Sequence, residues 1–306
     1  MEILRTDRLR LRWFTLDDAP FVMELLNDPG WQQNISDPGI RDLEAARRWT
    51  QERLIDIYWA QGHGFWLVER LADGEPLGLC GIFKRPSLSE PDVGYALLGR
   101  HAGQGYAREA ASACLRYARE VLGLRCVQAI TAAHNERSAH LLHAIGLRDL
   151  GLRKIDGYDE PERLFEWRDE AAPALSDAQQ IDALIARFYQ LFDNRAGRTP
   201  LLPILPMLML PGAQLHRADA SGLHSMDLKA FVEPRAELLR GRLVDFHEWE
   251  TEAQTHQQGG IAQRWSHYSK SGQMDGQPYG GQGLKTFQLL RTTRGWRISS
   301  VGWQDD

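Results

Sequence analysis

Residues 92–107 read DVGYALLGRHAGQGYA, and this stretch decides the fold of the first half of the chain. The apolar run at 92–98 predicts a strand, the glycines after it predict a turn, and the apolar stripe beyond Gly105 predicts a helix. A strand that runs through a glycine-bearing loop into a helix directs several backbone N–H groups to one point, with the positive end of the helix dipole behind them. The sequence therefore predicts a phosphate site at this loop.

The spacing within the loop leaves two interpretations open. Gly103 and Gly105 would let the backbone approach an anion without a Cβ in the way, and Arg100 would add a charge-assisted contact at the rim. The loop is not a Walker loop, because no Lys-Ser/Thr follows the glycines, and it is not a Rossmann fingerprint, because the third glycine is missing. By spacing alone, a plain strand-to-helix connection is as good an interpretation as a phosphate site.

Strands and helices alternate around this stretch. We expect strands at residues 9–14, 65–69, 77–83, 92–98, 126–131 and 164–167, and helices at 17–27, 43–58, 105–122 and 138–145. The three central strands, 65–69, 77–83 and 92–98, are expected to form an antiparallel meander. The first half is therefore predicted to be an α/β domain, a mixed sheet with helices on both faces.

A different order begins after a small, polar, proline-interrupted stretch at residues 169–177, which we interpret as a linker. The predicted domains are therefore 1–170 and 171–306. In the second, helices at 176–192 and 226–239 precede four strand candidates at 243–255, 260–268, 284–291 and 296–303. Helices first and an antiparallel sheet afterwards is an α+β layout.

Composition excludes several function classes. The chain has 36 Lys and Arg against 41 Asp and Glu, a net charge of −5, so tight binding to nucleic acid or to an anionic membrane is not expected. The start lacks an apolar signal segment, and the longest apolar run, 201–210, is about half the ~20 residues of a membrane-spanning helix. A cytoplasmic location is expected, with Cys80, Cys114 and Cys126 as reduced thiols. The histidines show no metal-ligand spacing, so no metal is expected.

Several motifs in order resemble the GNAT acetyltransferase superfamily. They are the Arg-x-x-Gly-x-Gly pattern from Arg100 to Gly105, the Asp-Val-Gly-Tyr strand before it, Asn135 and Ser138 after it, and Ile145-Gly146-Leu147. The opening TDRLRLR at 6–12 resembles the branch with the ribosomal-protein alanine N-acetyltransferases. The resemblance covers about residues 2–168. It implies an N-acetyltransferase that uses acetyl-CoA as co-substrate.

The resemblance also implies which residues hold acetyl-CoA. The loop would bind the pyrophosphate through Arg100, His101, Ala102, Gly103, Gln104, Gly105 and Tyr106. The splayed strand end at Ala96, Leu97 and Leu98 would pair with the pantetheine amides and supply an oxyanion donor. Asn135 would contact the cofactor arm, and it would serve equally well as a helix N-cap.

The resemblance also implies a general base and a proton donor, and for each residue a structural role is the alternative. Asp92 matches a position where relatives have a glutamate proposed as general base, and Ser138 matches a proposed proton donor; a solvated strand-end carboxylate and a structural serine are the plain alternatives. Leu142 stands where many members have a tyrosine that protonates the thiolate. The acceptor would be a protein N-terminus or a small-molecule amine. An α-amino group, with a pKa of ~7.8 against ~10.4 for lysine, needs less help from a base.

The second half resembles the nuclear transport factor 2-like or SnoaL-like cone fold over about residues 176–304, by element order and by its terminal Gly-Trp-Arg-Ile strand. Alternation would place His247 and Trp249 on one face of their strand, and Trp265 and His267 on one face of the next. These residues would line a pocket, or they would belong to a packed core with the histidines hydrogen-bonded inside or facing solvent. Such a domain would bind a ligand, catalyse, or form a homodimer. The alternative function for the whole chain is therefore an acetyl-CoA sensor or scaffold.

Overall fold

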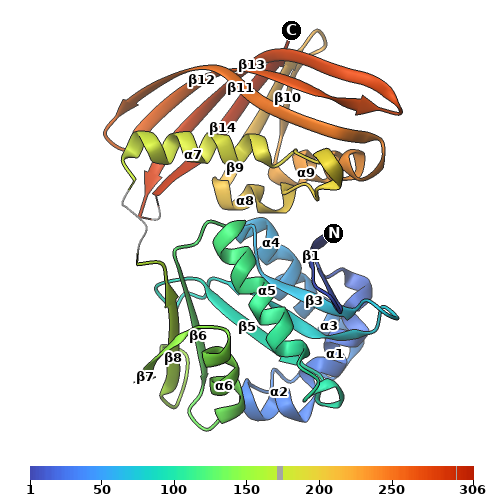
Figure 1. The fold of residues 1–306 in the computed structure, drawn as a ribbon, viewed down its shortest axis with the longest axis vertical. Helices are drawn as coiled ribbons and strands as arrows, with labels where there is room; N and C mark the ends of the chain where they lie inside the picture. The colour runs from blue at the N-terminus through green and yellow to red at the C-terminus, as the bar shows by residue number, and fades with distance from the viewer. Residues whose placement is uncertain (171–174, 294) are drawn as a thin grey trace. The chain divides into compact units, whose positions relative to one another are not determined.

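The computed structural model describes residues 1–170, 175–293 and 295–306. The chain divides into two compact units, Met1–Tyr58 with His63–Ala172, and Trp59–Gly62 with Pro173–Asp306 (Figure 1). The linker predicted at 169–177 includes residues 171–174, which lie outside the described residues. No described helix has both the length and the apolar character needed to cross a membrane.

The first unit is built on an eight-stranded mixed sheet with the order β1-β2-β3-β4-β5-β6-β8-β7. Its strands are β1 Glu2–Arg5, β2 Leu9–Arg12, β3 Phe65–Arg70, β4 Pro76–Phe83, β5 Asp92–Leu97, β6 Cys126–Ala132, β7 Arg148–Arg153 and β8 Glu162–Arg168. The predicted meander β3-β4-β5 is antiparallel, and β5 is parallel to β6. The sequence analysis missed β1 and β7, because these short strands are only partly buried and lack an apolar alternation.

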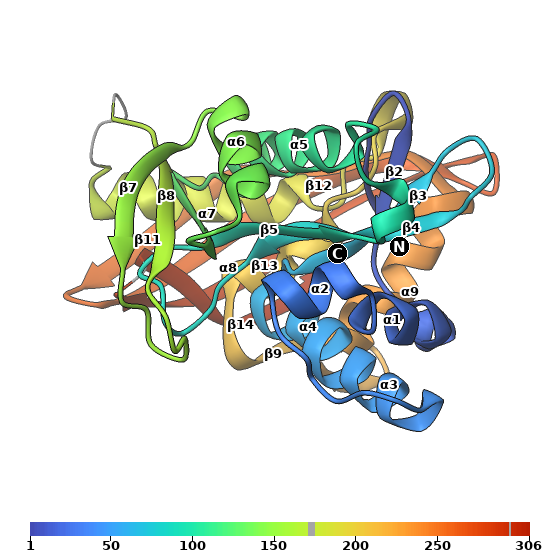
Figure 2. The same cartoon turned by 90° about the horizontal axis from the view of Figure 1, so that it is seen from below.

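Helices cover both faces of this sheet, as predicted (Figure 2). Helices α5 Tyr106–Glu120 and α6 Glu136–Ala144 lie on one face, and α1 Ala19–Leu26, α2 Pro29–Asn34, α3 Leu43–Thr50 and α4 Asp56–Gln61 lie on the other. The apolar stripe of α5 faces the sheet, and Cys114 of this helix lies 3.4 Å from Cys80 of β4, sulfur to sulfur. On the opposite face, Phe21 and Leu25 of α1 pack in a core cluster with Leu67 of β3.

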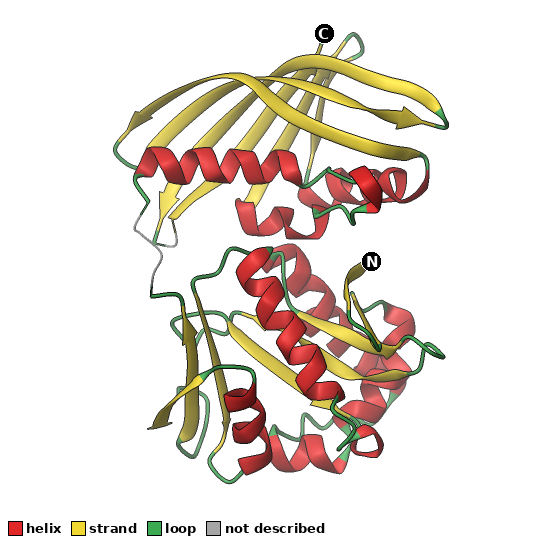
Figure 3. Cartoon of the chain, viewed as in Figure 1, coloured by secondary structure: helices red, strands yellow, loops and turns green. Residues whose placement is uncertain are grey.

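The second unit has its helices on one face of a six-stranded sheet (Figure 3). The helices are α7 Asp177–Gln190, α8 Leu205–Leu208 and α9 Leu228–Gly241. The sheet has the order β10-β9-β14-β13-β12-β11, with β9 Met209–Asp219, β10 Gly222–Met226, β11 Leu243–Gln258, β12 Ile261–Met274, β13 Gln277–Thr292 and β14 Gly295–Asp305. The sequence analysis missed β9 and β10, since Pro211 and Gly212 interrupt the strand pattern.

The two faces of β12 differ sharply in burial. Arg264, Ser266 and Tyr268 are buried on the face that α7 covers, where the Tyr189 hydroxyl lies 2.7 Å from the Ser266 hydroxyl. Trp265 lies on the opposite face and is 43% exposed. Because strand residues alternate between faces, the covered set of β12 is the one that the sequence analysis did not choose.

The pocket predicted from His247, Trp249, Trp265 and His267 is therefore corrected. Trp249 is 40% exposed and stacks on His247 with ring centroids 4.5 Å apart, while His267 is exposed beside Trp265 on the open face of β12. Alternation tells which residues share a face, but only the placement of the helices decides which face becomes the interior.

The two faces of β12 predict opposite mutational effects. Tyr268→Ala should lower the free energy of unfolding by about 3–5 kcal/mol, because it empties a buried aromatic site, whereas Trp265→Ala should change it by about 0.5 kcal/mol or less. Urea unfolding followed by circular dichroism measures both. Equal losses in the two variants would show that the covered face of β12 is assigned wrongly.

Candidate active site

The central feature of the first unit is the parting of β5 from β6. Strand β5 pairs with β4 along its whole length, from Asp92 opposite Phe83 to Leu97 opposite Gly78. Its other edge pairs with β6 at one position only, Asp92 opposite Gln128. Beyond that point the described residues leave the β6-facing edge of β5 without a strand partner. An extended ligand with amide groups could complete this edge as a further strand would.

Backbone direction decides which residues serve this open edge. The Leu98 N–H donates to the Leu77 carbonyl at 3.0 Å on the β4 side, and the Leu98 carbonyl accepts from the His101 N–H at 2.9 Å. Successive residues of a strand direct their backbone groups to opposite edges, so Tyr95 and Leu97 face the opening, while Ala96 faces β4. Of the predicted set Ala96, Leu97 and Leu98, only Leu97 therefore has backbone groups at the open edge.

The loop after β5 has the strand–turn–helix geometry that the sequence predicted. Gly103 and Gly105 have φ of +78° and +83°, values that side-chain-bearing residues rarely adopt. Gly105 is the N-cap of α5 and has no side chain to bond the first N–H groups of that helix. These groups have no partner within the helix, so they remain available to an anion.

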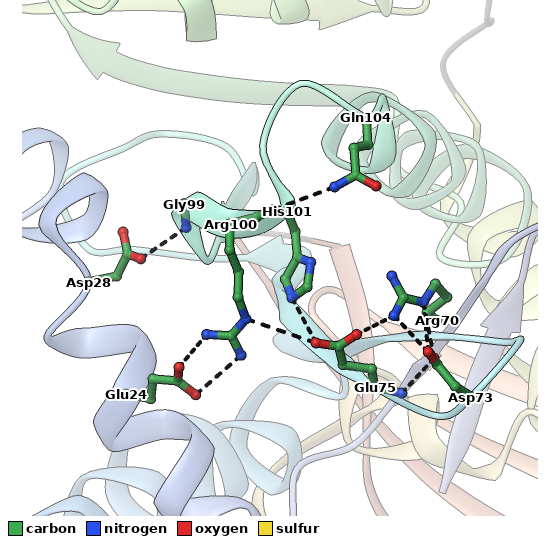
Figure 4. Close-up of polar contacts among 9 residues, drawn as sticks. All are labelled: Glu24, Asp28, Arg70, Asp73, Glu75, Gly99, Arg100, His101 and Gln104. Atoms are coloured by element: carbon green, nitrogen blue, oxygen red, sulfur yellow. Dashed lines mark hydrogen bonds and ion pairs between the residues drawn. The ribbon is translucent and has the colours of Figure 1, made fainter.

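The side chains of Arg100 and His101 hold the loop in place (Figure 4). The Arg100 guanidinium forms an ion pair with Glu24 of α1, and its Nε lies 3.9 Å from Oε1 of Glu75, in the β3–β4 hairpin. His101 is buried, with Nε2 3.2 Å from the same Glu75 oxygen. The sequence analysis expected Arg100 to contact the anion directly. In the structure two carboxylates already attract its charge, and Arg100 and His101 act as anchors.

A second arginine reaches the loop from the start of the chain. Nη1 of Arg8 donates to the Gln104 carbonyl at 3.1 Å, its Nε donates to Glu109 at 2.7 Å, and its guanidinium lies 4.6 Å from the centre of the Tyr106 ring. Arg8 therefore places a guanidinium, paired with Glu109, beside the helix N-terminus. The sequence analysis used Arg8 only as part of the opening motif and did not assign it to the site.

Asp92 is held in a buried ion pair. Its side chain is 1% exposed, and Arg85 donates to both carboxylate oxygens, from Nε at 3.0 Å and from Nη2 at 2.6 Å. Arg85 also bonds the Tyr158 hydroxyl at 2.5 Å. Burial raises the pKa of Asp92, and the neighbouring guanidinium opposes that rise. Asp92 is thus not the solvated strand-end group, because it is buried and both of its oxygens accept hydrogen bonds from Arg85.

The start of α6 places the predicted residues Asn135 and Ser138 near the diverging strands. There Ser138 contacts Tyr95 of β5, to which the sequence analysis gave no role. Asn135 is the N-cap of α6, with its side chain accepting from the Ser138 N–H at 3.0 Å. The Ser138 hydroxyl lies 2.9 Å from the hydroxyl of Tyr95 on β5. Burial raises the pKa of Tyr95 to about 12, so its hydroxyl stays protonated at neutral pH. Leu142, at the position where relatives have a tyrosine, is buried.

Glu162, at the start of β8, is a further titratable group near the opening. It is half-buried, and none of the described residues forms an ion pair or hydrogen bond with its carboxylate. Burial raises its pKa, while His134 and Arg85 oppose the rise. Glu162 lies opposite Ala132 at the end of β6, and a carboxyl group with a raised pKa is suited to accept a proton. No sequence motif marks Glu162, which is one of several acidic residues in its loop.

Comparison with known proteins places these features in a family context. Residues 8–148 match the family described as acetyltransferase (GNAT) domain. The uncharacterized protein YkkB of Bacillus subtilis (strain 168) is 33% identical over 172 residues, which are 53% of this chain and 94% of that protein. The uncharacterized N-acetyltransferase p20 of Bacillus licheniformis is 28% identical over 50% of this chain and 85% of that protein. A solved acetyltransferase from Agrobacterium tumefaciens str. C58 aligns with a TM-score of 0.46 and 28% identity, covering 54% of this chain and 94% of that one.

The Asp92–Arg85 pair predicts a stability effect. Asp92→Asn should lower the free energy of unfolding by roughly 3 kcal/mol, because it leaves a largely buried guanidinium without its counter-charge. Adding Arg85→Met should restore part of the loss. Urea unfolding of the wild type, both single variants and the double variant gives the coupling energy. Additive losses would rule out the pair as a coupled structural unit.

Proposed function

We propose that this acetyl-CoA-dependent acyltransferase acetylates a primary amine, either a protein N-terminus or a small molecule. The chain belongs to the GNAT acetyltransferase family through residues 8–148. The name of the Bacillus licheniformis relative, an N-acetyltransferase, supports an amine acceptor. The observation that carries the proposal is the open edge of β5 leading directly to the uncapped N-terminus of α5.

Acetyl-CoA binding would use the backbone more than side chains. The pantetheine amides would bond the free groups of Tyr95 and Leu97, and the pyrophosphate would bond the N–H groups from Gly103 to Tyr106. Arg8 is close enough to the loop to add a charge-assisted contact. Asn135 keeps its proposed contact with the cofactor arm together with its role as N-cap.

The reaction would be direct attack of the neutral amine on the thioester carbonyl. The nitrogen–carbon bond forms, the negative charge on the carbonyl oxygen is stabilised by a backbone N–H at the open edge, and the carbon–sulfur bond then breaks. We propose that the Ser138–Tyr95 hydroxyl pair gives a proton to the leaving thiolate and that Glu162 removes the proton from the amine. Asp92 would act through Arg85, by fixing the start of β5.

We also propose a fold family for the second unit and an oligomeric state for the chain. The sheet is antiparallel except where β9 pairs in parallel with β14, which differs from the wholly antiparallel sheet expected from the sequence. Its curvature and the helices on one face support the SnoaL-like assignment, and the two compact units support the division at 1–170 and 171–306. We propose that this unit also forms a homodimer, which sedimentation velocity of the full chain tests. A ribosomal-protein acceptor remains one choice within the amine class.

Acetyl-CoA binding is tested by Gly105→Ala. Saturating acetyl-CoA, at about 100 times its dissociation constant, should stabilise the wild type by about 2.7 kcal/mol. Gly105→Ala should lose this stabilisation, since a Cβ would strain a residue at φ +83° and would lie 3.4 Å from Nη2 of Arg8, beside the proposed phosphate position. Gly146→Ala is the matched control, because Gly146 has φ of +93° and open space around it, so it carries the backbone strain alone. Thermal unfolding with and without ligand measures both, and a retained shift in Gly105→Ala would contradict the loop assignment.

The base assignment predicts a pH dependence. A base must be deprotonated to act, so kcat should fall as the pH falls through the pKa of Glu162, which burial raises above the usual glutamate range. Glu162→Gln should reduce kcat about 100-fold or more and remove this acidic limb. Release of CoA, followed with a thiol reagent across pH on a panel of amines, measures the profile.

Three controls sharpen this experiment. Glu160→Gln, at an exposed position in the same loop, should leave the profile unchanged. Ser138→Ala and Tyr95→Phe should lower kcat yet keep the acidic limb and the affinity for acetyl-CoA. An unchanged limb in Glu162→Gln would overturn the base assignment, and acetyl-CoA binding without CoA release on any amine would favour the sensor or scaffold function.

A further inference from the structure

The interior of the second unit contains a cluster of charged side chains. They are contributed by helix α9 and by the last four strands, and they are Arg235, Glu248, Lys270, Lys285 and Asp305. Burying charge is costly unless each charge has a partner. The cluster can therefore be examined for any charge that remains without one.

Four of these charges form two pairs. The Lys285 ammonium lies 3.0 Å from Glu248 Oε2 and 3.1 Å from the centre of the Tyr268 ring, and Lys285 is 5% exposed. The Lys270 ammonium lies 2.5 Å from Asp305 Oδ1, which also accepts a bond from the Tyr268 hydroxyl. Each lysine thus has one carboxylate, and Glu248 and Asp305 attract Arg235 only from a distance, without forming an ion pair with it.

Arg235 is the charge in excess. None of the described carboxylates forms an ion pair with it, and its one hydrogen bond in the described chain runs from Nη1 to the Phe231 carbonyl of its own helix, at 3.0 Å. Its guanidinium lies 3.7 Å from the centre of the Phe231 ring and 5.6 Å from that of Trp303. Burial lowers the pKa of Arg235 to about 10, so the side chain remains charged at neutral pH.

The donors that Arg235 does not use point to a ligand class. A guanidinium presents its N–H groups in a planar fork that matches the two oxygens of a carboxylate, and Nε and Nη2 of Arg235 have no bond to the described residues. Phe231 is 4% exposed and its ring lies under the guanidinium, so the half-buried Trp303 is the ring of the two that a ligand could contact. A planar fork beside this ring matches a carboxylate that carries an aromatic group, and Arg217 is a further cation that acts on Arg235.

We propose that Arg235 and Trp303 form a binding site for a small aromatic carboxylate, with the carboxylate on the guanidinium and the ring against the Trp303 side chain. We call this group the Arg235 site. The site would supply the negative charge that the interior of the second unit lacks, and it is independent of the acetyl-CoA loop. It also replaces the pocket that the sequence analysis placed on the opposite face of the sheet.

The test uses the full chain with benzoate and 2-naphthoate as probes. Benzamide serves as the neutral analogue, and inorganic phosphate serves as an anion without a ring. Saturation-transfer NMR and calorimetry should detect both carboxylates, with 2-naphthoate binding more tightly because of its larger ring. Arg235→Met should weaken their binding by about tenfold or more, since a charged bond of this kind contributes well over 1.4 kcal/mol.

Arg240→Met is the matched control. Arg240 lies on the same helix and donates in the same way to a carbonyl four residues earlier, from Nε to Ala236 at 3.0 Å, but it is exposed, so its loss should leave binding unchanged. Circular dichroism and the thermal shift with acetyl-CoA check that Arg235→Met is folded. The proposal is overturned if neither carboxylate binds the wild type at millimolar concentration, if Arg235→Met binds as well as the wild type, or if benzamide or phosphate binds as tightly as benzoate.

Discussion

The single backbone pairing of Asp92 with Gln128 is the constraint on which the site in the first unit depends. If β5 and β6 paired along their whole length, the edge that faces a cofactor would be closed. The buried bond from Arg85 to Asp92 fixes β5 at the last point of pairing. Beyond it the strands part, and Tyr95 and Ser138 meet across the space between β5 and α6. Unpaired backbone groups are costly to bury, so the open edge of β5 needs solvent or a ligand as its hydrogen-bond partner.

The loop after β5 also binds through backbone groups, and side-chain contacts around it hold its conformation. Its amides carry the anion-binding capacity, and its side chains point elsewhere, to Glu24 and Glu75 through Arg100 and His101. A loop that binds through N–H groups needs its conformation fixed beforehand, since every freely moving residue would add an entropic cost on binding. The ion pairs of Figure 4 are therefore as much a part of the site as the glycines.

The second unit has buried ion pairs within an apolar and aromatic interior, and partly exposed tryptophans on its open face. Trp249 and Trp265 are partly exposed, whereas Lys285 and Arg264 are buried beside carboxylates. Among the clustered charges of α9 and the last four strands, Arg235 is the one that forms no ion pair with a described carboxylate. The proposed ligand site therefore lies at α9, and not on the outer face that strand alternation suggested.

The sequence by itself determined the features that are encoded locally: the strand–turn–helix around Gly105, the central meander, the N-cap at Asn135 and the family membership of the first half. Periodicity and glycine placement are properties of neighbouring residues, so they can be read along the chain. Tertiary structure alone decided that Arg85 forms an ion pair with Asp92 and that the Tyr95 hydroxyl contacts Ser138. It also decided that Arg8 donates to the Gln104 carbonyl and that β12 buries Tyr268 instead of Trp265. These outcomes depend on which distant elements pack together, and a pattern of alternate residues is the same whichever face is covered.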